Sequence, residues 1–338
     1  AREQIALVRP AIASIYANSV GTLAASAWLY GANVAVGTGN TSDKNYFTTR
    51  YLDYGGTVPD GYQWMRDPLD NNKVIIFTDT DFQSQWMHNA LWQKEYVGVN
   101  GGNQNVKYAA SISYLGDEGV FAMNGYDLYT GHVNVTFKVT DNLEATTAID
   151  LSSQKKEAFT DNYFNAFGRG IMFAPTARGY DDNGGWVGGN ANANANSASF
   201  YEAFYDRENV TNRAIGTFGL RWKIFDGLTA NAQYTWYDNN YRGSYYARGE
   251  VNGVSNRISS TRSTTETRTQ TTRQTATANL AFDKTFASVH HFSAMTGFEY
   301  MHNRYWYLTA NSTGSTSDDV PIIDSGLNFT ASNKDEIQ

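Results

Sequence analysis

The sequence predicts an all-β protein, built as an antiparallel up-and-down sheet of the kind that forms transmembrane β-barrels. Three observations lead to this fold class: long segments in which apolar and polar residues alternate, connections that alternate between short turns and long loops, and a composition suited to strands. Phe, Trp and Tyr together make up 14% of the 338 residues, and aromatic residues are enriched in strands. No run of about 20 apolar residues occurs, so the sequence predicts no membrane-spanning helix.

The clearest alternation lies between Tyr126 and Thr140. Its apolar residues are Val133, Val135, Phe137 and Val139, each separated from the next by a polar residue. A period of two places successive side chains on opposite faces of a strand. After a short turn the pattern resumes from Leu143 to Leu151, so these two segments predict a β-hairpin.

Six further segments alternate in the same way, which brings the prediction to about eight strands. They cover residues 94–100, 106–114, 214–224, 228–236, 276–282 and 292–300. The third and fourth of these segments are joined through Asp226-Gly227, a dipeptide that favours tight hairpins.

The connections between these segments alternate strictly in length. The short turns cover residues 101–105, 140–142, 226–227 and 284–288, and the long loops cover 116–125, 154–212, 239–264 and 310 onward. In an up-and-down sheet this alternation places every short turn at one end. Outer-membrane barrels have short periplasmic turns and long extracellular loops, so the polar faces are expected to line a wet lumen.

This orientation predicts three regions. Residues 1–90 are expected to form an extracellular loop region with a short helix near Glu3 to Ala17. Residues 91–310 are expected to contain the transmembrane strands, and residues 311–338 an extracellular loop that leads to the next strand. Because the strand at 94–100 would run inward, we expect another strand to precede it, and therefore expect the chain to be an internal section of a longer barrel.

Composition excludes several functional classes. The 26 Lys and Arg residues against 33 Asp and Glu give a net charge of −7, which argues against binding to nucleic acid. The absence of cysteine excludes disulfides and thiolate metal sites. No catalytic motif is recognised, so we expect neither an enzyme nor a cofactor. The neighbours His290 and His291 point to opposite faces of a strand and cannot share a metal ion, and no metal site is expected.

Several segments resemble the SusC-type TonB-dependent transporters of Bacteroidetes, in the order that family has them. Thr78–Phe82 resembles its "TDW" segment, with Phe82 in the place of the tryptophan. Residues 94–103 and 108–114 resemble a strand ending in "SGG" and the "Y…S…Y" strand that follows it. Residues 175–184 look like a loop of the family, and residues 282–300 resemble its "KTFG.KH…GFE" hairpin.

This resemblance implies a 22-stranded barrel in the outer membrane of a Gram-negative bacterium, of which this chain would be a section. It also implies active import of oligosaccharides or oligopeptides. The implied partners are a SusD-like surface lipoprotein, the TonB complex and the lipid of the outer membrane. No motif of the family's plug domain is recognised in the sequence.

The candidate ligand contacts lie in the long loop that precedes the strand at 214–224. This loop is rich in Asn, Gly and aromatic residues, which can stack on sugars and amides or form hydrogen bonds with them. The candidates are Tyr180, Trp186, Tyr201 and Tyr205.

Two other functions fit the same periodicity. The first is a small, self-contained outer-membrane barrel that acts as an adhesin or structural protein. The second is a secreted, soluble β-sandwich that binds carbohydrate. A barrel is favoured over a sandwich because several segments exceed the usual strand length and because the connections alternate in length.

Overall fold

The structure is a computed structural model of the whole chain. It describes residues 1–17, 22–32, 34–42, 45–157, 173–180, 183–184, 202, 204–249, 251–252, 257–258 and 262–337. Among these residues no helix combines the length and the apolar character needed to cross a membrane.

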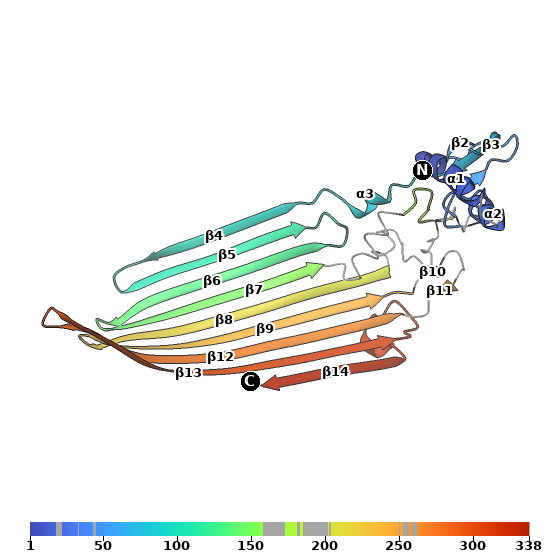
Figure 1. Cartoon of the computed structure of the whole chain (residues 1–338). Coiled ribbons are helices and arrows are strands. Elements are labelled where there is room, and N and C mark those ends of the chain that lie inside the picture. The colour runs from blue at the N-terminus through green and yellow to red at the C-terminus, as the bar shows by residue number, and fades with distance from the viewer. Residues whose placement is uncertain are drawn as a thin grey trace.

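Nine long strands form one antiparallel sheet (Figure 1), in the spatial order β14-β13-β12-β9-β8-β7-β6-β5-β4. Their bounds are β4 Trp92–Gly102, β5 Val106–Glu118, β6 Gly125–Thr140, β7 Leu143–Glu157, β8 Tyr205–Phe225, β9 Leu228–Ala247, β12 Ser263–Phe286, β13 His290–Thr313 and β14 Asn328–Ile337. The two-residue strands β10 Val251–Asn252 and β11 Arg257–Ile258 pair with each other. All eight predicted strands are present, and β4 and β14 form the two edges of the described sheet.

The short connections lie together at one end of the sheet, as the sequence predicts. The β4–β5, β6–β7, β8–β9 and β12–β13 turns gather on the left of Figure 1, and the described β5–β6 and β13–β14 connections lie on the right. Each of these pairs is antiparallel and joined at its nearest ends.

The long strands extend farther into the predicted loops than the alternation indicates. Strand β8 begins at Tyr205, inside the loop expected over 154–212, and β9 continues to Ala247, inside the loop expected over 239–264. Both faces of these extensions carry many polar residues, so hydrophobic periodicity cannot detect them, although the backbone ladder continues. Strand β14 likewise occupies part of the loop predicted over 311–338.

The sheet has one apolar and one polar face. Leu220, Ala232, Ala278 and Phe298 lie in one cross-strand row of the apolar face. A row on the opposite face, three residues along the strands, contains Thr217, Thr235, Thr275 and Met301. Phe298 is 69% exposed, so its ring faces outward from the sheet, not into a protein core.

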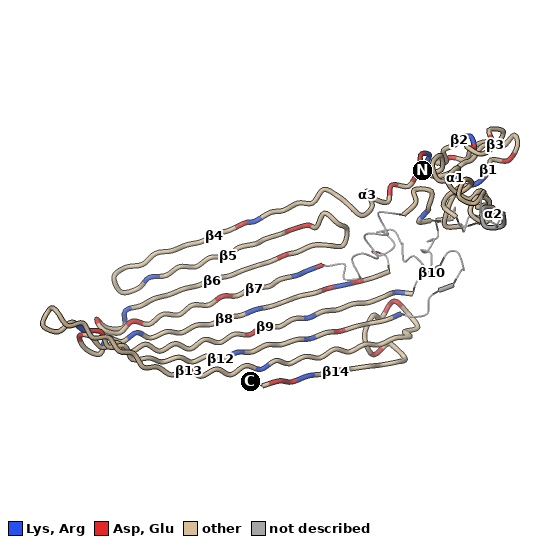
Figure 2. Tube along the Cα trace, viewed as in Figure 1, with Lys and Arg blue, Asp and Glu red and all other residues tan. Residues whose placement is uncertain are grey.

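The apolar band covers only part of the length of the longest strands. On β9 it extends from Leu228 to Trp236, and the following residues on that face are Asp238, Asn240, Arg242 and Ser244. Strands β8, β9, β12 and β13 therefore extend beyond the band by about ten residues, or about 33 Å at 3.3 Å per residue. Figure 2 shows charged residues gathered at the turn end and along the loop-end halves of these strands.

Residues 1–90 contain more regular structure than the sequence predicts. Helices α1 (Arg2–Ala17) and α2 (Thr22–Tyr30) precede a small sheet of order β1-β3-β2, made of Arg50–Tyr51, Asp70–Phe77 and Gln63–Asp67. Its apolar core contains Ile5, Val36, Ile75 and Phe77. We call residues 1–80 the N-terminal unit. Helix α3 (Phe82–Trp86) connects it to β4.

A buried ion pair joins α1 to the small sheet. Arg9 and Asp67 are both fully buried, and Arg9 Nη2 lies 2.7 Å from Asp67 Oδ2. Arg9 Nη1 donates to the carbonyls of Leu29 and Val36, and the hydroxyl of Tyr51 donates to Asp67 at 2.6 Å. Burial and the hydrogen bond to Asp67 raise the pKa of Tyr51 to about 12, so this hydroxyl keeps its proton.

A short segment of the long β7–β8 connection packs against the N-terminal unit. The backbone N–H of Thr48 donates to Thr176 O at 2.9 Å, and that of Thr80 donates to Pro175 O at 2.8 Å. The ring of Phe173 meets Phe82 edge-on, with centroids 5.2 Å apart. The N-terminal unit therefore anchors this connection at the loop end of the sheet.

Candidate functional site

The structure places two of the four predicted contact residues, on different segments of the chain. Tyr180 is 47% exposed and follows the segment that packs against the N-terminal unit. Tyr205 begins β8, and its ring stacks on Tyr245 with centroids 6.2 Å apart. Trp186 and Tyr201 lie outside the described residues.

Tyr205 belongs to a larger aromatic surface on the polar face of the sheet. Strand β9 carries Tyr237, Tyr241 and Tyr245 at intervals of four residues, which places all three on that face. The hydroxyl of Tyr241 donates to Asn209 Oδ1 at 2.8 Å. Tyr237 lies at the middle of β9 and the other two tyrosines lie on its loop-end half, so they could contact a ligand that enters from that end.

A cavity of about 300 Å³ opens within this surface. Its lining includes Arg207, Asn209, Tyr241, Gly243 and Tyr245. The guanidinium carbon of Arg207 lies 4.5 Å from the ring centroid of Tyr245. Gly243 keeps the cavity open, because a Cβ there would lie 2.5 Å from the Tyr241 hydroxyl. The cavity can offer a ligand a cation, hydroxyl groups and aromatic rings.

Sequence reasoning missed this cavity because it assigned residues 239–264 to a loop. The signal that could have found it is the spacing of the tyrosines on β9, since residues four apart in a strand share a face. The partners Arg207 and Asn209 come from β8 and become neighbours only through strand pairing.

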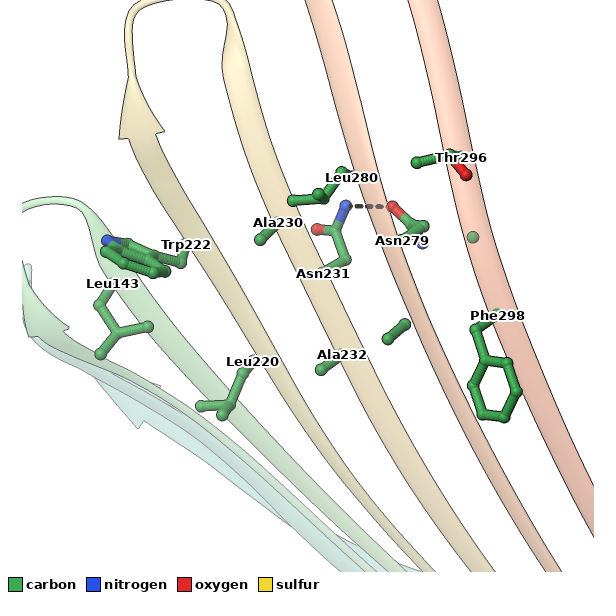
Figure 3. Close-up of a pocket in the computed structure, with 12 residues that line it drawn as sticks. Leu143, Leu220, Trp222, Ala230, Asn231, Ala232, Asn279, Leu280, Thr296 and Phe298 are labelled. Atoms are coloured by element: carbon green, nitrogen blue, oxygen red, sulfur yellow. Dashed lines mark hydrogen bonds between the residues drawn. The ribbon is translucent and has the colours of Figure 1, made fainter.

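A hollow with a volume of about 730 Å³ lies on the other face of the sheet (Figure 3). Small residues such as Ala230 and Ala232 form its floor, while Leu220, Trp222 and Phe298 rise around them. This lining suits hydrocarbon and offers little to a polar ligand. Among the described residues, no three His, Asp or Glu side chains gather as a metal site.

A charged cluster fixes the β13–β14 connection at the loop end. Arg262 Nε donates to Asp318 Oδ1 at 2.9 Å, and Tyr246 donates to the same oxygen at 2.8 Å. The backbone N–H of Gly249 also donates to it, at 3.1 Å. The hydrogen bond from Arg262 is the main cause that lowers the pKa of Asp318 to about 2.

We expect the stability of this cluster to depend on pH. The pKa of Asp318 is lower in the folded state than the usual 3.9 or so of an unfolded aspartate, so its contribution is present above about pH 4 and is lost as the pH falls towards 2. Asp318→Asn should make amide exchange in residues 314–327 faster at pH 7 and less sensitive to acid. Asp319→Asn serves as the control, since its carboxylate accepts from Ser317 and forms no described ion pair. Equal acid sensitivity of exchange in wild type and Asp318→Asn would contradict this role.

These features define an antiparallel β-protein whose large sheet has one apolar face and one polar face rich in tyrosine. Its fold is similar to that of solved chains described as the RagAB peptide transporter. The first has a TM-score of 0.65 and 18% sequence identity, over 77% of this chain and 30% of that chain. Structures of the RagAB peptide importer in the "closed-closed" and "open-open" states give TM-scores of 0.64 and 0.65, each at 17% identity.

The likeness is one of fold, because the sequence identity is low. This chain spans less than a third of the length of those solved chains. No protein-family model matches the sequence, and no curated protein does either.

Proposed function

We propose that this chain is a wall section of an outer-membrane, TonB-dependent importer of oligopeptides that works with a SusD-like surface lipoprotein and catalyses no reaction. The observation that carries the proposal is the long amphipathic sheet, which shares its fold with a peptide transporter over 77% of the chain. The segments that resemble SusC-type transporters support the same proposal independently.

In this proposal the apolar face contacts lipid and the polar face lines the transport path. The apolar band on β9 spans residues 228–236, about 27 Å along the strand, or about 21 Å in height at a strand tilt of about 40°, which is close to the apolar band of about 25 Å on a barrel wall. The short turns would lie in the periplasm. The N-terminal unit would lie on the extracellular side. So would the cavity lined by Arg207 and Tyr245, here called the Tyr245 cavity, and the cluster of Arg262, Tyr246 and Asp318, here called the Asp318 cluster.

Peptides are favoured over oligosaccharides as the substrate. The solved chains of similar fold are described as peptide transporters. The polar face also offers arginine beside tyrosine, at Arg207 and Tyr245, and guanidinium groups match carboxylates in geometry.

The first test is to isolate the intact protein from membranes and identify what accompanies it. We expect a species larger than this chain, a lipoprotein partner and bound peptides in its mass spectrum. A lone species of this chain's own mass would overturn the proposal and favour the small self-contained barrel. Co-purified glycans without peptides would assign the substrate to the other class.

Variants of the cavity test its role in uptake. We expect Tyr241→Ala combined with Tyr245→Ala to reduce peptide uptake about tenfold, which corresponds to about 1.4 kcal/mol of binding. Tyr234→Ala is the matched control, because Tyr234 lies on the apolar face of the same strand. Uptake that is unchanged in the double variant would remove the cavity from the transport path.

A further inference from the structure

Positive charge gathers on the polar face of the four longest strands, although the chain as a whole has a net charge of −7. The register of β8, β9, β12 and β13 assigns alternate residues to this face. The cations on it are Arg207, Arg213, Arg221, Lys223 and Arg273. The acids on it are Asp283 and Glu299, and Asp283 already lies 3.5 Å from His291. This wall is therefore electropositive.

Two of these arginines flank one tyrosine. Arg213 on β8 pairs with Asn239 of β9, and Arg273 on β12 pairs with Tyr237 of β9. Two strand spacings and a two-residue offset place the Cα atoms of the two arginines about 12 Å apart. Both arginines are exposed, so their long side chains can converge on one group that lies over Tyr237.

The described residues do not neutralise these two cations. Neither Arg213 nor Arg273 forms an ion pair or a side-chain hydrogen bond within the described part of the chain. The acid nearest to Arg213 in the register is Asp150, diagonally across on β7. The carboxylate of Asp150 is bound instead by His132 Nδ1, at 2.5 Å.

The residue that pairs with Arg273 on the neighbouring strand β13 is also uncharged. Asn303 of β13 pairs with Arg273 in the register. Its amide oxygen is buried and has no hydrogen-bond partner among the described residues. Around the pair, the wall thus offers two guanidinium groups, one amide oxygen and one tyrosine ring, with no acid bound to either arginine.

We propose that Arg213 and Arg273 bind a carboxylate of the transported peptide, which makes the preferred substrates acidic peptides or peptides with a free C-terminal carboxylate. This inference rests on the proposed function and goes further by assigning the charge of the substrate. A guanidinium group offers a planar pair of donors that fits a carboxylate. The ring of Tyr237 provides an apolar surface for the rest of the peptide residue that carries the carboxylate.

The test uses the intact transporter and synthetic peptides of one sequence in two forms. One form carries glutamate and a free C-terminus, and the other carries glutamine and a C-terminal amide. We expect tighter binding of the acidic form, and a loss of about tenfold for that form alone in Arg213→Gln combined with Arg273→Gln. The matched control is Arg242→Gln combined with Arg268→Gln, because these arginines lie on the opposite face and pair with each other.

Each outcome has a separate meaning. An equal loss for both peptides, or no loss for either, would overturn the role of the two arginines while leaving peptide import intact. Binding of neither peptide by the wild type would overturn the proposed function itself. If the double variant fails to fold, the binding of both peptides by the wild type is measured at increasing salt concentration. Carboxylate recognition requires that added salt weakens binding of the acidic peptide and not of the amide.

Discussion

Ala232→Arg should sharply reduce the amount of folded protein in the outer membrane. Ala232 lies at the middle of the apolar band on β9 and on the floor of the 730 Å³ hollow. The hollow therefore has room for the arginine side chain, and the expected loss of stability comes chiefly from moving its charge out of water. An arginine at the bilayer midplane of a barrel costs about 2–4 kcal/mol. The measurement is the fraction that keeps its heat-modifiable, folded band on a gel.

The neighbouring residue supplies the control. Gln233→Arg changes the same strand one position along, on the polar face, and should fold as the wild type does. Ala232→Leu adds volume without charge and should also fold. If Gln233→Arg were the more damaging change, the assignment of the two faces to lipid and lumen would be wrong.

Arg9→Met should open the N-terminal unit while the large sheet stays folded. The change removes both hydrogen bonds to Asp67 and the donors to the carbonyls of Leu29 and Val36. It leaves the Asp67 carboxylate buried without its cation, and breaking a buried pair in this way typically costs about 3–5 kcal/mol. We expect rapid protease cleavage and amide exchange within residues 1–80.

Arg2→Met is the matched control. Arg2 lies on the same helix, and its guanidinium donates only to the carbonyl of Trp64 from an exposed position. Its substitution should leave protease cleavage unchanged. Replacing Arg9 and Asp67 together by Met and Leu should restore part of the stability, because no unpaired charge remains. Equal cleavage of wild type and Arg9→Met would show that the pair contributes little to the stability of the unit.

The two faces of the sheet and its hairpins follow from the sequence alone. Where one face of a strand meets an apolar environment and the other a polar one, the polarity of each residue indicates the face on which its side chain lies. The alternation from Val133 to Val139 on β6 is an example. The short turns are equally local, since Asp226-Gly227 reverses the chain between β8 and β9 through its own backbone preferences.

Tertiary structure alone decided the loop-end half of the molecule. The face of β9 that is apolar from Leu228 to Trp236 is polar from Asp238 to Ser244, so the alternation of apolar and polar residues ends there. Strand β9 nevertheless continues to pair with β8 and β12. The Tyr245 cavity and the pair formed by Arg213 and Arg273 depend on that pairing. The contact between Thr48 and Thr176 joins residues 128 positions apart. Local periodicity reports the surroundings of each side chain, whereas such contacts depend on which distant segments the folded backbone brings together.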